Sequence, residues 1–92
     1  SDAFLEVFTM PVELLKAGAK HVIGIKQTAK AIEKGTAKIV FVAKDADACV
    51  IDPLIAACAG ANLVYETVAS MQELGKLCGI HVGAAAAAIL KD

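Results

Sequence analysis

The chain has 92 residues, 58% of them apolar, and a formal net charge of −1 at pH 7. That length suits one domain with a core of its own, and the lack of an apolar run of about 18 residues argues against a membrane-spanning helix. Its three cysteines form no CxxC pair, so we expect reduced thiols in a cytoplasmic protein, without a zinc site or a disulfide framework.

Positive charge is concentrated in the first half of the chain. Residues 14–44 hold seven lysines and one glutamate, whereas the other residues hold two lysines and nine acids. A basic segment on an otherwise acidic body is typical of a surface that faces a polyanion. Lysines scattered over a solvated surface would give the same asymmetry, so charge alone leaves both interpretations open.

The first elements are short. Residues 1–9 look discontinuous with the rest of the chain, and we expect a leader or tag-like extension there and a single domain over residues 10–92. Pro11 to Lys16 suits a short helix that ends at Gly18, because proline is tolerated in a first helical turn. Residues 20–25 (KHVIGI) are β-branched and bounded by glycine, which predicts a buried strand.

A helix and a strand are predicted next. Lys26 to Lys34 fits a helix that ends at Gly35, since glycine is favoured just past a helix terminus. We expect this helix to turn Ala29, Ile32 and Ile25 inward. Residues 37–43 (AKIVFVA) form a continuous apolar run, which predicts a strand buried on both faces.

The segment after this strand contains two aspartates. Asp45 and Asp47 resemble the acid pair of magnesium-dependent phosphatases, but no second acidic motif is placed to complete a metal site. A loop or helix-capping role is therefore favoured. Val50 to Ala59 then predicts a helix with Pro53 in its first turn, closed by residues 60–62.

The C-terminal third predicts a strand, a helix and an ambiguous tail. Leu63 to Glu66 suits a short strand, and Ser70 with Glu73 forms a capping box for a helix that runs to about Leu77. Five successive alanines in the tail favour helix by intrinsic propensity, although a central strand that needs small side chains would also fit. Strands that alternate with helices predict an α/β fold, with helices on both sides of a small sheet.

The predicted helix over residues 26–34 carries the clearest candidate site. Lys26, Lys30 and Lys34 recur every four residues and line one face, although like charges at that spacing destabilise an isolated helix by roughly 0.2–0.5 kcal/mol per pair. A bound phosphate backbone would offset this cost. Gln27 lies in the first turn, where free N–H groups favour anions, and its amide can donate to and accept from a base edge. A solvated lysine face is the alternative.

A second candidate segment is the apolar loop Ile80-His81-Val82, for which plain core burial is an equally good explanation. The remaining cysteines and histidines show no metal-ligand spacing and no nucleophile–base pairing. We therefore predict no catalytic residues, no metal site and no cofactor.

Taken together, two segments resemble one known family. VIGIKQTAKAIEKGTAKIVFVAKDAD, with ELGKLCGIHVGAAAAAIL some thirty residues later, is similar to the ribosomal kink-turn-binding family, which includes the archaeal L-seven-Ae type proteins and small bacterial kink-turn-binding relatives. The resemblance covers about Pro11 to Leu90. It implies a three-layer α/β/α sandwich with a mixed four-stranded sheet, in which the alanine tail is a strand.

The resemblance also implies a function and a site. The partner would be RNA, a kink-turn in rRNA or in an mRNA leader, with the ribosome as a candidate assembly and no membrane. Gly24 would let the backbone approach RNA, Lys26 and Gln27 would read sheared G·A pairs, and Ile80, His81 and Val82 would pack on an extruded nucleotide. Lys30 would contact the RNA nearby, and Lys34 continues the basic face.

Three features differ from the family pattern. Ile25 stands where threonine is usual, His81 stands where many members have glutamate, and residues 48–63 are more apolar than is typical. The last difference suggests an alternative: a protein-interaction or self-associating module that keeps the fold with weak RNA affinity.

Overall fold

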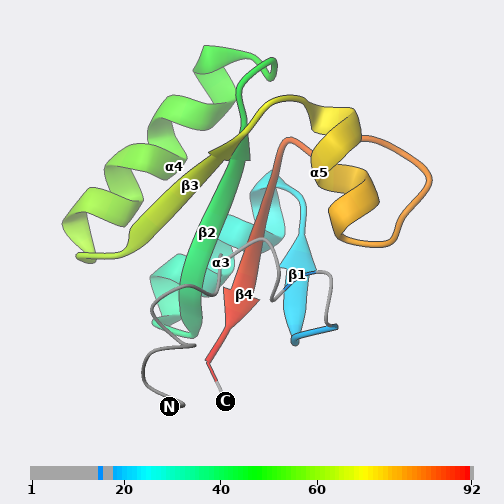
Figure 1. Ribbon diagram of the computed structural model, residues 1–92. Helices are drawn as coiled ribbons and strands as arrows, with labels where there is room; N and C mark the ends of the chain where they lie inside the picture. The colour runs from blue at the N-terminus through cyan, green and yellow to red at the C-terminus, as the bar shows by residue number, and fades with distance from the viewer. Residues whose placement is uncertain (1–14, 16–17, 92) are drawn as a thin grey trace, which may run out of the picture.

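The computed structural model describes Leu15 and residues 18–91 of the chain. With the labels of Figure 1, its elements are β1 (His21–Ile23), α3 (Ile25–Lys34), β2 (Ala37–Ala43), α4 (Ala48–Gly60), β3 (Val64–Val68), α5 (Met71–Leu77) and β4 (Ala86–Leu90). The predicted extension over residues 1–9 lies outside the described residues. So does the predicted helix of residues 11–16, except for Leu15, which is helical and buried.

A mixed four-stranded sheet forms the middle layer. The strands are ordered β1-β4-β2-β3, with β4 antiparallel to both of its neighbours and β3 parallel to β2. Because β4 runs opposite to the other three strands, its amino end lies with the carboxyl ends of β1, β2 and β3. We call this end of the sheet, which is at the top of Figure 1, the upper edge. Within the described residues, no helix is both long and apolar enough to cross a membrane.

Helices cover both faces of this sheet, which confirms the α/β/α sandwich. On one face, α3 and α4 pack against Val40, Val42, Ala86 and Ala88. On the other face, Leu74 of α5 and Leu15 share a core with the alternate residues of the same strands, Phe41, Ala43, Ala87 and Ile89. These two clusters account for the apolar runs in β2 and β4, since every side chain of a central strand meets a helix layer.

The alanine tail is a strand, as the resemblance implies, and the helix favoured by propensity is wrong. β4 lies between β1 and β2, and Ala86, Ala87 and Ala88 are fully buried. Alanine costs little in a helix, but here the free energy of burying both faces and completing two ladders decides the conformation. Intrinsic propensity is a weak prior when tertiary contacts compete with it.

Three sequence predictions shift in detail. In α3 the inward positions are Thr28, Ala31 and Ile32, which follow the i, i+3, i+4 spacing of one helix face, while Ala29 is exposed. β1 is a half-buried edge strand rather than a buried one. Helix α4 begins at Ala48, capped by Asp47, so Pro53 falls in its second turn and not in its first.

Candidate nucleic-acid interface

Helix α3 begins at a turn that only glycine adopts readily. Gly24 is its N-cap, with φ 104° and ψ 156°, and no side chain caps the helix. The first turn contains no acidic residue, so nothing there neutralises the partial positive charge of the helix terminus. Lys26 adds a full positive charge at the same place. This helix start is therefore suited to an anion or a hydrogen-bond acceptor.

Replacing Gly24 with alanine is expected to lower the free energy of unfolding by about 1–3 kcal/mol, the typical cost of a residue forced into such a conformation. A Cβ at this position would meet no atom within 4 Å, so the cost is conformational rather than steric. Urea denaturation of the variant measures it. Unchanged stability would mean that the turn before α3 relaxes to a negative φ without loss.

The lysines of α3 share one exposed face. Lys26, Lys30 and Lys34 are exposed, as is Gln27, whereas the buried residues of the helix lie opposite them. The predicted basic stripe is therefore present. Lys34 is the last residue of α3 and lies about 12 Å along the axis from Lys26 at 1.5 Å per residue. The basic face thus runs the length of the helix and is not confined to its start.

A shallow hollow accompanies the basic face. It has a volume of about 120 Å³ and is lined by Val22, Gln27, Lys30, Ala31, Lys34, Thr36 and Leu90. Its floor is apolar, and its rim carries two lysines and an amide. A ligand seated there would therefore meet positive charge and hydrogen-bonding groups at its edges.

The second predicted segment, residues 80–82, is presented by helix α5. Gly75 of α5 is buried, and a Cβ on it would overlap the carbonyl oxygen of Val82. The Ile80 N–H donates to the Gly75 carbonyl at 3.0 Å, and the Ala84 N–H donates to the Met71 carbonyl, also at 3.0 Å. The loop therefore lies directly against α5, with backbone packed on backbone.

Within this loop the side chains divide between core and solvent. Ile80 packs against the cluster around Phe41, whereas His81 is exposed and Val82 is 71% exposed. Plain core burial therefore accounts for Ile80 but not for the next two residues. An exposed valine on a backbone held from behind is a ready surface for a flat apolar partner such as a nucleobase.

The sheet brings the start of α3 and the loop together. The Gly24 N–H donates to the Ala86 carbonyl at 2.8 Å, and Ala86 begins β4, just after the loop. Two segments some 60 residues apart in sequence thus meet at the upper edge of the sheet (Figure 1). Gly24 thus ties the start of α3 to the segment that follows residues 80–82, while Lys34 lies at the other end of α3.

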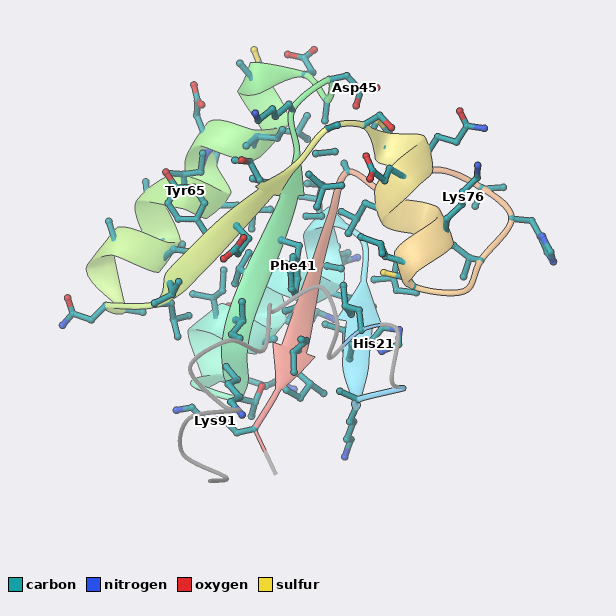
Figure 2. All side chains as sticks on the ribbon, viewed as in Figure 1. His21, Phe41, Asp45, Tyr65, Lys76 and Lys91 are labelled. Atoms are coloured by element: carbon teal, nitrogen blue, oxygen red, sulfur yellow. The ribbon has the colours of Figure 1, made fainter. Side chains whose placement is uncertain are left out.

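Two further lysines lie at this edge that the sequence did not single out. Lys44 comes directly after β2, where the Ala43 N–H donates to the Ala85 carbonyl at 2.9 Å. Lys76 is exposed on α5 (Figure 2), next to Gly75, which contacts the loop backbone. A lysine immediately after a buried strand is a sequence signal for Lys44. No such signal existed for Lys76, whose position depends on how α5 packs.

The two aspartates after β2 accept backbone hydrogen bonds at the starts of α4 and α5. Asp47 accepts a hydrogen bond from the Cys49 N–H at 3.0 Å and caps α4, and Asp45 accepts from the Met71 N–H at 2.7 Å at the start of α5. The capping role predicted for this segment is confirmed. Ser70 likewise caps α5 by accepting from the Glu73 N–H at 3.0 Å. Among the described residues, no group of three His, Cys, Asp or Glu side chains could hold a metal ion.

The surroundings of Cys58, Cys78 and His21 indicate structural roles for these side chains. Burial raises the pKa of the Cys58 and Cys78 thiols, which keeps both protonated and weakly nucleophilic at neutral pH. The ring of His21 (Figure 2) lies 2.7 Å, Nδ1 to oxygen, from the carbonyl of Ala19. None of these groups supplies an activated nucleophile.

Comparisons with known proteins show which proteins this chain resembles. The sequence profile of the "Ribosomal protein L7Ae/L30e/S12e/Gadd45 family" matches residues 10–92. An "RNA-binding protein" of Geobacillus thermodenitrificans is 51% identical over 79 residues, which cover 86% of this chain and 95% of that one. "RNA-binding protein YbxF" of Geobacillus stearothermophilus has the same identity and coverage. The solved "Giardia lamblia 15.5kD RNA binding protein" superposes with a TM-score of 0.81 and 28% identity, covering 100% of this chain and 77% of that one.

Proposed function

The chain belongs to the ribosomal protein L7Ae/L30e/S12e/Gadd45 family, and from that premise we propose that it is a non-enzymatic cytoplasmic RNA-binding protein that recognises kink-turns. Its targets would be kink-turns, with their sheared G·A pairs, in ribosomal RNA or in regulatory mRNA leaders. The relatives that bear the name RNA-binding protein support the coarser part of this proposal. The finer part rests on the geometry of the upper edge of the sheet.

One observation carries the proposal: the hydrogen bond from the Gly24 N–H to the Ala86 carbonyl. It joins the uncapped, lysine-bearing start of α3 to Ala86, the first residue of β4, which follows the loop that carries the exposed Val82. A cationic helix start and an apolar loop on one edge suit a ligand that presents phosphates and an unstacked base together. A single strand with splayed bases or a distorted helix has that character, whereas a regular RNA duplex does not.

Each site residue then takes a role from its position. Lys26 and Gln27, in the first turn of α3, would hydrogen-bond the edges of the sheared G·A pairs, which a kink exposes by opening the narrow RNA major groove. Gly24 would allow the RNA to approach the backbone closely. His81 and Val82 would stack on an extruded nucleotide, with Ile80 anchoring the loop to the core. Lys30 and Lys34 would contact phosphates, which position the RNA without reading its sequence.

The proposal is tested by titrating the protein into a labelled kink-turn RNA at moderate salt. The matched control RNA carries Watson–Crick pairs in place of the sheared G·A pairs, with its length and charge unchanged. We expect tight binding to the first RNA and loss of that binding with the second. Equal, weak and salt-sensitive binding to both would instead make α3 a general polyanion surface and would favour the interaction-module alternative.

Replacing Lys34 with alanine should mainly change the salt dependence of binding. This lysine lies at the far end of α3 from the loop, where a phosphate contact is the expected role. Loss of one such contact reduces the slope of log K against the logarithm of salt concentration by roughly 0.7–0.9. It weakens the binding of both RNAs equally. Titrations at several salt concentrations measure the slope. A selective loss of kink-turn binding would place Lys34 at the bases instead.

A further inference from the structure

The edge of the molecule farthest from the proposed RNA site is unusually apolar. Of the four large apolar residues that are exposed in the described part of the chain, Val82 belongs to the loop, and the other three lie on α4 and β3. These three are Val50 (38% exposed), Val64 (64%) and Tyr65 (41%). Figure 1 shows β3 at the opposite side of the sheet from β1, with α4 alongside it.

Helix α4 lacks the polar face of an ordinary surface helix. Its sequence, ACVIDPLIAACAG, contains one charged residue, Asp52. Its exposed positions are otherwise small or apolar: Ala48, Cys49, Val50, Pro53, Ala56, Ala59 and Gly60. A helix with one solvated side normally carries several charges there. A protein surface that covers α4 would account for these uncharged positions. It would also account for the departure of residues 48–63 from the family pattern.

Within the described residues, strand β3 also leaves backbone groups without a partner. Among the described strands it pairs with β2 alone. The Val68 carbonyl accepts from the Lys44 N–H at 2.8 Å, so Val68, Glu66 and Val64 point their backbone groups toward β2. Because these directions alternate along a strand, the N–H and C=O groups of Tyr65 and Thr67 point outward. An edge of this kind is a template for pairing with another strand.

We propose that this edge joins two copies of the chain through antiparallel β3–β3 pairing about a two-fold axis at Tyr65. In this register the Tyr65 N–H and C=O groups of the two copies bond reciprocally. The Thr67 N–H of each copy meets the Leu63 carbonyl of the other, whereas the Leu63 N–H already donates to the Cys58 carbonyl within its own chain. A two-fold axis makes such contacts self-complementary.

The side chains disfavour two alternative registers. An axis at Glu66 would oppose two like charges directly, which is unfavourable, and an axis at Thr67 would leave Val64 outside the pairing. An axis at Tyr65 sets the two Tyr65 rings side by side and places Val64 of each copy opposite Glu66 of the other. The net charge of −1 means that the copies repel each other only weakly.

In the same register, the α4 helices of the two copies approach each other, and each copy reaches a hollow on the other. Tyr65 and Thr67 pair with Val40 and Val42 and so lie on the α4 side of the sheet, where the two α4 helices would approach. A mostly apolar hollow of about 220 Å³ opens beside Thr67, and its lining consists of Val42, Ala43, Ala46, Ala48, Ile51 and Ile55 together with Lys44 and Asp52. Leu63 of the second copy would lie next to it. The small exposed side chains of α4 allow a close approach of the two helices.

The test is analytical ultracentrifugation of the protein without RNA, which keeps it independent of the proposed RNA function. We expect the mean mass to rise from 9.4 kDa toward about twice that value as the concentration rises from about 10 μM to about 1 mM. Tyr65→Glu, which opposes two carboxylates at the axis, should raise the dimer Kd at least about tenfold. The control Gln72→Glu makes the same charge change on α5 and should leave the Kd unchanged.

Amide hydrogen exchange of the unmodified chain tests the pairing of this edge without relying on a variant. The Tyr65 and Thr67 amides should gain protection as the concentration rises, whereas the Glu66 amide, already bonded within the sheet, should be protected throughout. A mass that stays at the monomer value up to about 1 mM would overturn the proposal. So would a dimer that is insensitive to Tyr65→Glu and forms without added protection at Tyr65 and Thr67.

Discussion

Replacing Lys26 with alanine is expected to weaken kink-turn binding by about 1–3 kcal/mol, or roughly 5- to 150-fold in Kd. The side chain lies in the first turn of α3 and is itself exposed. Its loss should therefore leave the free energy of unfolding nearly unchanged. Titration of the labelled kink-turn RNA measures the Kd, and urea denaturation measures the stability.

The matched control is Lys38→Ala, which removes an exposed lysine from β2 instead of α3. It should weaken binding only slightly and equally for both RNAs, since it removes general electrostatic attraction alone. Gln27→Ala separates base recognition from electrostatic attraction, because it removes the amide and leaves the net charge unchanged. We expect this variant to discriminate less between the kink-turn RNA and its Watson–Crick control. Normal kink-turn binding by Lys26→Ala would refute the assignment of the first turn of α3 as the reading surface.

Replacing Gly75 with alanine is expected to impair both stability and binding. The added Cβ would overlap the Val82 carbonyl oxygen and would lie 3.3 Å from the Cα of Gly83. Those atoms are backbone and cannot rotate aside, so the loop must move away from α5. Overpacking of this kind costs typically about 1–3 kcal/mol. The displaced loop would carry Val82 away from its present position against α5, so kink-turn affinity should fall even in the fraction that is folded.

Gly60→Ala provides the control for this substitution. Gly60 ends α4, and a Cβ there would meet no atom within 4 Å. Because alanine loses less conformational freedom than glycine in a helix, the change should be neutral or stabilising by up to about 1 kcal/mol. Urea denaturation and RNA titration of both variants distinguish a specific contact from a general effect of glycine loss. A Gly75→Ala protein as stable as the unmodified one would show that α5 does not hold the loop by this contact.

The order of local elements was predictable because each depends on neighbours in sequence. Gly35 ends α3 in the left-handed region, with φ 74°, and Ser70 caps α5 through the Glu73 N–H, as their residue types predict. The apolar run of residues 37–43 is a buried strand with the predicted bounds. The lysine face of α3 likewise results from helical spacing alone.

Distant contacts decided the rest. Five successive alanines favour a helix in isolation, but β4 gains two ladders and two helix layers by lying between β1 and β2. The inward face of α3 is decided by docking on the sheet, where Ala31 and Ile32 pack in the cluster that contains Val40. Periodicity gives the spacing of a face but not which side meets the sheet.

Local sequence patterns were enough for the order of the elements, for their types apart from the alanine tail, and for the residues that could bind an anion, because capping, spacing and burial patterns are local properties. Only the tertiary structure decided that the start of α3 and the loop of residues 80–82 share one edge. It also decided that Val82 is exposed while Ile80 packs against the core. The physical reason is that a site built from two distant segments depends on strand register and on backbone packing, such as that of Gly75 against Val82, which no local pattern encodes.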